Sequence, residues 1–474
     1  MKEQNLKSFL LDPYLLLSIG SFLVLFLPFL GTIPYLDGNI DFVKGYDFFS
    51  GGFSKLFQNW ASVHPPGKEL IALAFFKLFG VNRYSYTLIS PLFGVLGIIL
   101  IYLLTSRIFG KIPGRISTFL LAINPLFLSV GIFSLTDYLL TIFVIGSFYF
   151  YLREKIFPFV IFLTLSFLTK ESGLLVPLSI ILIELLTIKE TVSKKRSFPL
   201  NAWLALIFPF LIVYFWFNFL KINGKPLWSD WNFSETAKQG SLYTIVNNLT
   251  TFSFFNKYAY ENWLHLFVLN FNWLYWSILI VGTFLLLKKN LLKKPFTMFL
   301  NTSSGKTLLS IILFCTLYSL TVLSFQTYPI PRYVLPITPF IFLGVAKSLQ
   351  EIQKSLKITW SLFLIPLLPV IGMSLFLSLD PISSTLWNKE TVLGQEIYAM
   401  RKKLAGNDGI TYNMQYALIA KKRTQQILAA KIKGQIVYSE NCFWIYPDPR
   451  NDSKTNQVLK LNINFEKPCL NTDF

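Results

Sequence analysis

Charged residues are scarce in this sequence. They make up 14% of its 474 residues, whereas about a quarter of the residues of a soluble domain are charged. Hydrophobic residues make up 53% of the chain and aromatic residues 17%. Such a chain has too little polar surface to cover itself in water, which argues against a soluble protein.

Histidine and cysteine are scarce as well. The chain has two histidines and three cysteines. A zinc site or a disulfide framework needs several of these residues at short, regular spacing. The sequence therefore predicts no metal site, and it leaves open only a single disulfide between Cys442 and Cys469.

Several motifs that would point to other functions are absent. The sequence has no G-x-x-x-x-G-K-[ST] loop for the phosphates of a nucleotide and no G-x-S-x-G turn for a hydrolytic serine. Gly- and Pro-interrupted spans do not recur in matching halves, as they do in inverted-repeat transporters. We therefore expect no cofactor.

In place of charge, the sequence has long apolar runs. Most of them reach the roughly 17–25 residues that cross a bilayer as a helix. They are Pro13–Leu30, Tyr84–Ser106, Ile116–Leu135, Tyr138–Leu152, Ile156–Thr169, Ser172–Ile188, Phe198–Leu220, Trp263–Leu287, Thr307–Gln326, Tyr333–Ala346 and Ile358–Leu379. The pattern predicts an all-α polytopic membrane protein with about eleven transmembrane helices, in a range of about nine to thirteen.

The net charge of +19 is distributed unevenly along the chain. With eleven spans and the N-terminus inside, the inside segments hold nineteen Lys and Arg against five acidic residues, and the outside segments hold eleven against nine. This asymmetry follows the positive-inside rule. It indicates contact with membrane lipids of the plasma membrane and argues against a nucleic-acid partner.

Two regions interrupt the alternation of spans and short loops. The outside loop 31–83 contains two segments with apolar residues at helical spacing, which predict amphipathic helices on the membrane surface. From residue 381 to 474 the composition becomes ordinary, and we expect a small α/β domain outside the membrane. Residues 1–380 would then form the transmembrane domain.

Ionisable residues gather at the predicted outer ends of the spans. Each of them, taken singly, is more often an interfacial charge that faces water. Taken together they predict a polar cavity at the outer leaflet, because charges at this depth are costly and mark functional sites. They include Asp37, Asp41, Asp47, His64, Lys68, Glu69, Asp137, Lys170, Glu171 and Arg332. Carboxylates beside cations suit a reaction that removes a proton and receives an anionic leaving group.

Several motifs appear in an order that resembles one family. "PYLDGNIDFVKGYDFFSGG" is followed by "VHPPGKEL", by a run that starts at "LFGVNRY" and ends in "SLTDYLLTIFV", by "LTKESGLLVPL" and by "YPIPRYVLPITPFIFLGVAKSL". This order resembles the membrane-embedded, polyprenyl-phosphate-dependent glycosyltransferases of the GT-C superfamily. The nearest branch contains protein O-mannosyltransferases, lipid A aminoarabinose transferases and lipopolysaccharide galacturonosyltransferases. The resemblance covers about residues 10–350.

The resemblance implies a reaction and a role for each candidate residue. A sugar would move, with inversion, from a polyprenyl-phosphate carrier to a hydroxyl group of a lipid, glycan or protein at the outer leaflet. Asp37 is the expected base, with Asp41 as an alternative carboxylate and Asp137 positioning the acceptor. The expected contacts of the donor phosphate are His64, Lys68, Lys170 and Arg332.

The sequence departs from the family pattern at two positions. Gly38 follows Asp37 where the family usually has Glu, and "HPPGK" lacks the leucine that mannosyltransferases place before Gly-Lys. The second departure argues against a protein O-mannosyltransferase. Three alternatives stay open at this point: His64 caps the second surface helix, the protein is a lipid-linked-glycan flippase or transporter, or it is an O-antigen-type polymerase or ligase.

Overall fold

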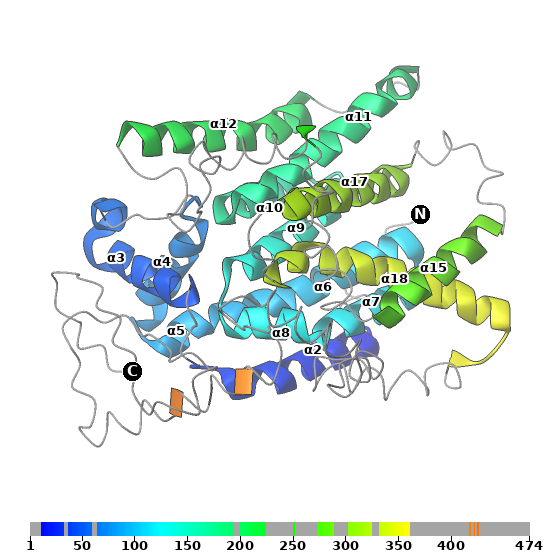
Figure 1. Cartoon of the computed structure of the whole chain (residues 1–474), viewed down its shortest axis with the longest axis horizontal. Coiled ribbons are helices and arrows are strands. Elements are labelled where there is room, and N and C mark those ends of the chain that lie inside the picture. Colours follow the sequence, from blue (N-terminus) through cyan, green and yellow to red (C-terminus); the bar gives the residue numbers. More distant parts are fainter. Residues whose placement is uncertain are drawn as a thin grey trace.

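A computed structural model describes residues 11–32, 37–58, 64–193, 200–223, 273–288, 302–324 and 331–360, with the short stretches 250–251, 417–418, 421 and 424–425 (Figure 1). The regular elements in these residues are helices. They are α2 (Pro13–Phe26), α3 (Asp37–Gln58), α4 (Gly67–Phe79), α5 (Arg83–Thr87), α6 (Ile89–Phe109), α7 (Lys111–Ala122), α8 (Pro125–Ile132), α9 (Thr136–Leu152), α10 (Ile156–Thr169), α11 (Leu175–Ser193), α12 (Leu200–Ile222), α15 (Trp273–Lys288), α17 (Ser303–Ser324) and α18 (Thr338–Leu356), with the 3-10 helices η1 (Leu27–Phe29), η2 (Glu171–Leu174) and η7 (Pro331–Ile337).

Helix α9 lies at the centre of the bundle (Figure 1). Its sequence is apolar on all sides, and nearly every residue from Asp137 to Leu152 is buried. A helix without a polar face is stable only when other helices surround it. α9 accordingly packs against α6 and α10, and α6 packs in turn against α7.

The described residues contain four helices that are long and apolar enough to cross a membrane, or five if one bent pair counts as a single span. Four shorter apolar helices accompany them. The predicted class, a helical protein with several apolar helices, is therefore confirmed. The prediction of eleven spans is not confirmed, and residues 361–379 of the last predicted run lie outside the described residues.

The run Ile116–Leu135 was expected to form one span, and the structure divides it between two helices. The chain forms α7 and α8 there, which meet at an angle of 49°. The break lies at Asn124 and Pro125: the Asn124 side chain accepts a hydrogen bond from the backbone N–H of Phe127, and Pro125 occupies the first turn of α8. Proline has no N–H to continue the preceding helix, so it starts a new one.

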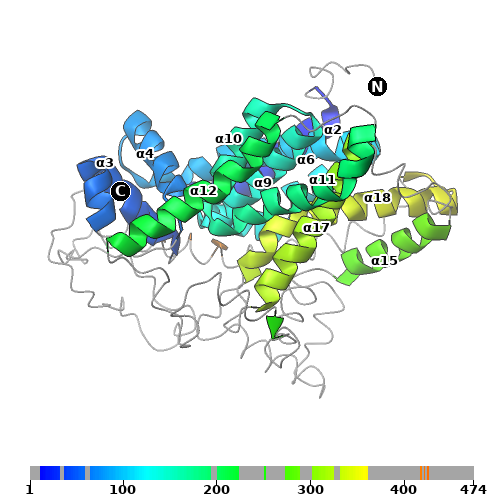
Figure 2. The same ribbon diagram turned by 90° about the horizontal axis from the view of Figure 1, so that it is seen from above.

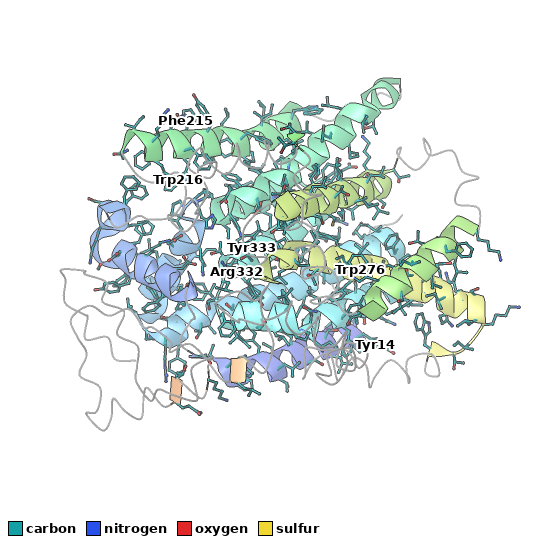
Figure 3. All side chains as sticks on the ribbon, viewed as in Figure 1. Tyr14, Phe215, Trp216, Trp276, Arg332 and Tyr333 are labelled. Atoms are coloured by element: carbon teal, nitrogen blue, oxygen red, sulfur yellow. The ribbon has the colours of Figure 1, made fainter. Side chains whose placement is uncertain are left out.

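The two segments predicted to be amphipathic helices form α3 and α4, which lie side by side at one end of the bundle (Figures 1 and 2). Phe42 of α3 makes edge contacts with Phe76 of α4 and with Tyr86, which joins the pair to the bundle. At the far end of α3, Phe57 packs against Phe219 of α12, and Trp216 of α12 faces the same group (Figure 3). The predicted C-terminal α/β domain, 381–474, lies almost entirely outside the described residues.

Ion pairs away from α3 and α4 join helices along the rest of the bundle. Asp12 accepts hydrogen bonds from Tyr102 at 2.8 Å and from Arg115 at 2.9 Å, which ties the start of α2 to α6 and α7. Glu184 of α11 accepts a hydrogen bond from Lys306 of α17 at 2.7 Å and another from Tyr151 of α9. Each of these carboxylates has one cation, so its charge is neutralised within the bundle.

Gly94 of α6 leaves room for Phe22 of α2 and Tyr138 of α9, and we expect Gly94→Ala to destabilise the protein. A Cβ atom there would lie 2.2 Å from the Tyr138 hydroxyl and 2.4 Å from the Phe22 ring. Overpacking of this kind costs about 1–3 kcal/mol, so the melting temperature in detergent should fall. Gly20→Ala is the control, because nothing lies within 4 Å of its Cβ position. An equal melting temperature for both variants would contradict this packing.

Candidate active site

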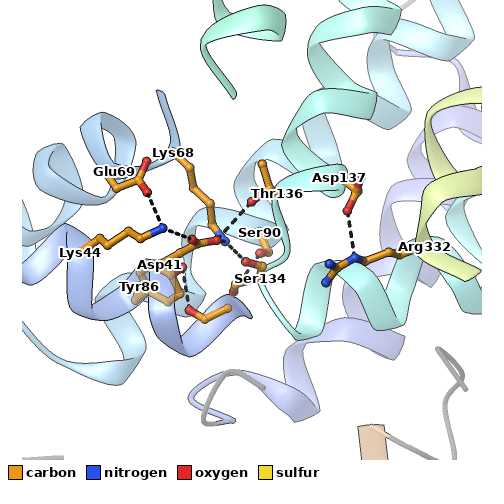
Figure 4. Close-up of polar contacts among 11 residues, drawn as sticks. Asp41, Lys44, Lys68, Glu69, Tyr86, Ser90, Ser134, Thr136, Asp137 and Arg332 are labelled. Atoms are coloured by element: carbon orange, nitrogen blue, oxygen red, sulfur yellow. Dashed lines mark hydrogen bonds and ion pairs between the residues drawn. The ribbon is translucent and has the colours of Figure 1, made fainter. Parts of the chain in front are cut away.

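Ionisable side chains from α3, α4, the start of α9 and η7 come together where α3 and α4 meet the rest of the bundle (Figure 4). Lys170, which follows α10, joins them. They form two groups. The Asp41 cluster consists of Asp41, Lys44, Lys68, Glu69 and Thr136. The Asp137 cluster consists of Asp137, Lys170, Arg332 and Tyr333.

Lys68 holds Asp41 in a buried ion pair. Lys68 Nζ lies 2.7 Å from Asp41 Oδ2, and the Thr136 hydroxyl donates to the same oxygen at 3.1 Å. Lys68 also donates to the carbonyl oxygen of Ser134, and its Nζ lies 5.6 Å from the centroid of the Tyr86 ring. Burial raises the pKa of Asp41, but Lys68 and Lys44 outweigh it and hold that pKa below its usual value. Asp41 is therefore a carboxylate in this state.

Lys44 and Glu69 extend the Asp41 cluster. Lys44 Nζ lies 3.7 Å from Asp41 and 4.0 Å from Glu69. Burial is the largest influence on Glu69, and together with the negative charge of Asp41 it raises the pKa of Glu69 to about 7, although Lys44 opposes the rise. Two carboxylates and two ammonium groups thus share this pocket, and one of the carboxylates gains or loses a proton near neutral pH.

Asp137 contacts two cations from different parts of the chain. Lys170 Nζ lies 2.7 Å from Asp137 Oδ1, and Arg332 Nε lies 3.2 Å from Oδ2. Asp137 stands in the first turn of α9, where the helix dipole favours a negative charge, and Lys170 directly follows α10. The Tyr333 ring lies 4.4 Å from Lys170 Nζ and 5.6 Å from the Arg332 guanidinium. Figure 3 places Arg332 and Tyr333 near the middle of the molecule.

His64 contacts Glu171, the residue after Lys170. The His64 Nδ1 and Glu171 Oε2 atoms are 2.6 Å apart. Burial opposes ionisation of Glu171, but His64 outweighs it and lowers the pKa of Glu171 to about 2. The contact ties the residues that precede α4 to η2, so His64 does more than cap a surface helix.

Residues 134–137 connect the two clusters. The Ser134 carbonyl and the Thr136 hydroxyl belong to the contacts of Lys68 and Asp41, whereas Asp137 binds Lys170. Ser134 has a φ of +50°, a conformation that is uncommon for residues other than glycine. Its hydroxyl lies 3.3 Å from that of Ser90. A four-residue turn therefore sets the spacing between the clusters.

The structure brings six of the seven predicted site residues to one place. They are Asp41, His64, Lys68, Asp137, Lys170 and Arg332. The seventh, Asp37, begins α3, and its side chain lies outside the described ones. Among the residues that the structure describes, no three His, Cys, Asp or Glu side chains are placed to hold a metal ion.

The sequence-based prediction missed Lys44, Thr136, Ser134 and Tyr333. Lys44 could have been found, because it stands three residues after Asp41 on a helix, the spacing at which side chains meet. Ser134, Thr136 and Tyr333 carry no such signal. Their roles depend on which residues of other elements the fold brings beside them.

Comparison with known proteins agrees with the predicted family. Residues 63–216 match the family model described as dolichyl-phosphate-mannose-protein mannosyltransferase. This stretch is about a third of the chain and contains His64, Lys68, Asp137 and Lys170. The match confirms the predicted resemblance to the GT-C glycosyltransferases over this stretch. No curated protein matches the chain.

Three solved structures are similar to the chain at low identity. ArnT from Cupriavidus metallidurans in the apo state is 14% identical with a TM-score of 0.48, over 79% of this chain and 64% of that one. ArnT bound to undecaprenyl phosphate is 13% identical with a TM-score of 0.48, over 89% and 77%. The Archaeoglobus fulgidus oligosaccharyltransferase in the apo form is 12% identical with a TM-score of 0.46, over 81% and 59%. The chain thus covers less than two thirds of the first of these structures.

We expect Glu69 to make the stability of the protein depend on pH. The Glu69 proton leaves near pH 4.5 in the unfolded chain and near pH 7 in the folded protein. The folded state therefore binds this proton more tightly, and the stability it contributes is complete below pH 4.5 and is lost as the pH rises through 7. The melting temperature should fall between about pH 5 and pH 8, and Glu69→Gln should reduce that slope.

Asp12→Asn is the control for this measurement. Burial opposes ionisation of Asp12, but Arg115 and Tyr102 outweigh it and hold the pKa of Asp12 below its usual value. Arginine does not titrate between pH 5 and pH 8, so this variant should leave the slope unchanged. A slope that survives Glu69→Gln would show that another group titrates instead.

Proposed function

We propose that this chain, a member of the GT-C glycosyltransferase superfamily, moves a sugar from a polyprenyl-phosphate carrier to a hydroxyl group of a glycan, lipid or protein. The observation that supports this most directly is the meeting of buried carboxylates with Lys170 and Arg332 beside α3 and α4. The carboxylates can take a proton, and Lys170 and Arg332 can neutralise a departing phosphate. The asymmetry of Lys and Arg supports a site at the outer leaflet of the plasma membrane.

The proposed reaction is a single displacement. The acceptor oxygen attacks the anomeric carbon while the bond from that carbon to the phosphate oxygen breaks, so the configuration inverts. The electron pair stays with the phosphate, and a carboxylate takes the hydroxyl proton. No nucleotide or redox partner is needed, because the sugar–phosphate bond of the donor supplies the leaving group.

The proposed base is Asp37, with Asp41 as the alternative. Asp41 Oδ2 already accepts hydrogen bonds from Lys68 and Thr136, and Lys44 lies 3.7 Å from its other oxygen. Such a carboxylate is stabilised in its ionised form, which makes it a weaker proton acceptor. This supports a role for Asp41 in organising the pocket, with the proton taken by Asp37 at the start of the same helix.

The proposed phosphate contacts are Lys170 and Arg332 in the first place, and His64 and Lys68 in the second. Lys170 and Arg332 both contact Asp137, so two cations lie beside the same carboxylate. Lys68 is engaged by Asp41, the Ser134 carbonyl and the Tyr86 ring, and His64 by Glu171. A fixed positive charge in a water-poor site lowers the energy of the departing phosphate by several kcal/mol.

Asp37→Asn should reduce sugar transfer by at least about a hundredfold, the usual contribution of general-base catalysis. The assay mixes purified full-length protein with a panel of polyprenyl-phosphate sugars and an acceptor extract, without nucleotide, and measures release of free polyprenyl phosphate. A transporter forms no glycosidic bond and would release none.

Asp47→Asn is the control on the same helix. Asp47 pairs with Lys55 at 3.6 Å, outside both clusters, so this variant should keep its activity. Loss of activity in Asp41→Asn with full activity in Asp37→Asn would assign the base to Asp41. Full activity in both variants would contradict the proposed function.

A further inference from the structure

The two clusters differ in how their charges balance. The Asp41 cluster holds two carboxylates, Asp41 and Glu69, and two ammonium groups, Lys44 and Lys68. In the Asp137 cluster one carboxylate faces both Lys170 and Arg332. The neighbouring Glu171 is engaged by His64 at 2.6 Å. Before a donor binds, Asp137 is therefore the anion in direct contact with both cations.

The placement of these groups allows one anion to replace another. The Asp137 side chain is 3% exposed, whereas those of Lys170 and Arg332 are 12% and 13% exposed. The cations thus reach further toward solvent than the carboxylate behind them. The Tyr333 ring contacts both cations, at 4.4 Å and 5.6 Å, and cation–π contact would keep them in position when their carboxylate partner changes.

We propose that Asp137 is the resident counter-ion of the phosphate site, and that the donor phosphate takes over its contacts with Lys170 and Arg332. This inference rests on the proposed function and assigns Asp137 a role other than positioning the acceptor. Two buried cations without an anion are unfavourable, so the carboxylate keeps the empty site stable. The same carboxylate competes with the phosphate for these cations and weakens its binding.

Competition by Asp137 also has a consequence for product release. A sugar-linked polyprenyl phosphate is a diester with one negative charge, and cleavage leaves free polyprenyl phosphate, a monoester with about two negative charges at neutral pH. When the bond from the anomeric carbon to the phosphate oxygen breaks, the electron pair remains on the phosphate, and the acceptor proton goes to the base. Asp137 then lies beside a more negative group, and its return to Lys170 and Arg332 favours departure of the product.

The test measures binding of polyprenyl phosphate to the purified full-length protein in detergent, with the uncharged polyprenol as the reference ligand. Asp137→Asn removes the competing charge, and binding should tighten by about tenfold, the effect of one charge-assisted contact. Sugar transfer should fall in the same variant, because product release slows. A catalytic or acceptor-positioning role alone would not tighten phosphate binding.

Glu184→Gln is the matched control, because it removes the same charge from another buried ion pair. Glu184 pairs with Lys306 at 2.7 Å and with Tyr151. Tyr151 stands fourteen residues after Asp137 on α9, about 21 Å along the helix. Binding of polyprenyl phosphate should be unchanged in Glu184→Gln, and tightening there as well would overturn the inference by showing an effect of overall charge.

A double variant keeps the test decisive if Asp137→Asn fails to fold. Asp137→Asn with Lys170→Met removes both partners of the 2.7 Å pair, which leaves no uncompensated charge from that pair. Its affinity should return toward that of the wild type. Equal or weaker binding in Asp137→Asn than in the wild type overturns the inference alone. Failure of both proteins to prefer polyprenyl phosphate over polyprenol overturns the proposed function as well.

Discussion

A carboxylate that is removed from water must be met by cations or hydrogen-bond donors, because an unpaired buried charge costs several kcal/mol. This requirement determines how the helices are oriented where α3 and α4 meet the rest of the bundle. Asp41 on α3 is met by Lys68 on α4, Asp137 on α9 by Lys170 after α10, and Glu171 by His64. Apolar packing has no direction, so it can bring these helices together without fixing their rotation. The ion pairs fix the rotation.

Ion pairing by itself does not mark the site. The same kind of ion pair occurs elsewhere in the bundle, between Asp12 and Arg115 and between Glu184 and Lys306. Among the described residues, each of these carboxylates meets one cation and one tyrosine hydroxyl. Such pairs are neutral and join helices. Asp137 differs because two cations meet it. This arrangement of two cations on one carboxylate is the feature on which the proposed phosphate site rests.

Residues 134–137 contribute contacts to both clusters of the candidate site. Ser134 and Thr136 complete the contacts of Lys68 and Asp41, and the next residue, Asp137, belongs to the other cluster. In the reaction proposed above, this turn would set the spacing between the carboxylates of α3 and the cations that receive the phosphate. Precise spacing of this kind is what a displacement reaction requires, because the attacking and leaving oxygens must stand on opposite sides of one carbon.

The sequence by itself determined the class of the protein, and it predicted six of the residues that the structure brings together at the candidate site. Scarce charge and long apolar runs require helices in a membrane, and charges kept at the ends of those runs are too costly to be incidental. Hydropathy could not show that Asn124 and Pro125 break one run into α7 and α8, since the residues on both sides are equally apolar.

Only the tertiary structure decided which carboxylate meets which cation. From the sequence, Lys68 could have paired with Asp41, Glu69 or Asp137. The packing of α4 against α3 brings its ammonium group to Asp41, because the partners of a charge depend on distances between elements that are far apart in the chain.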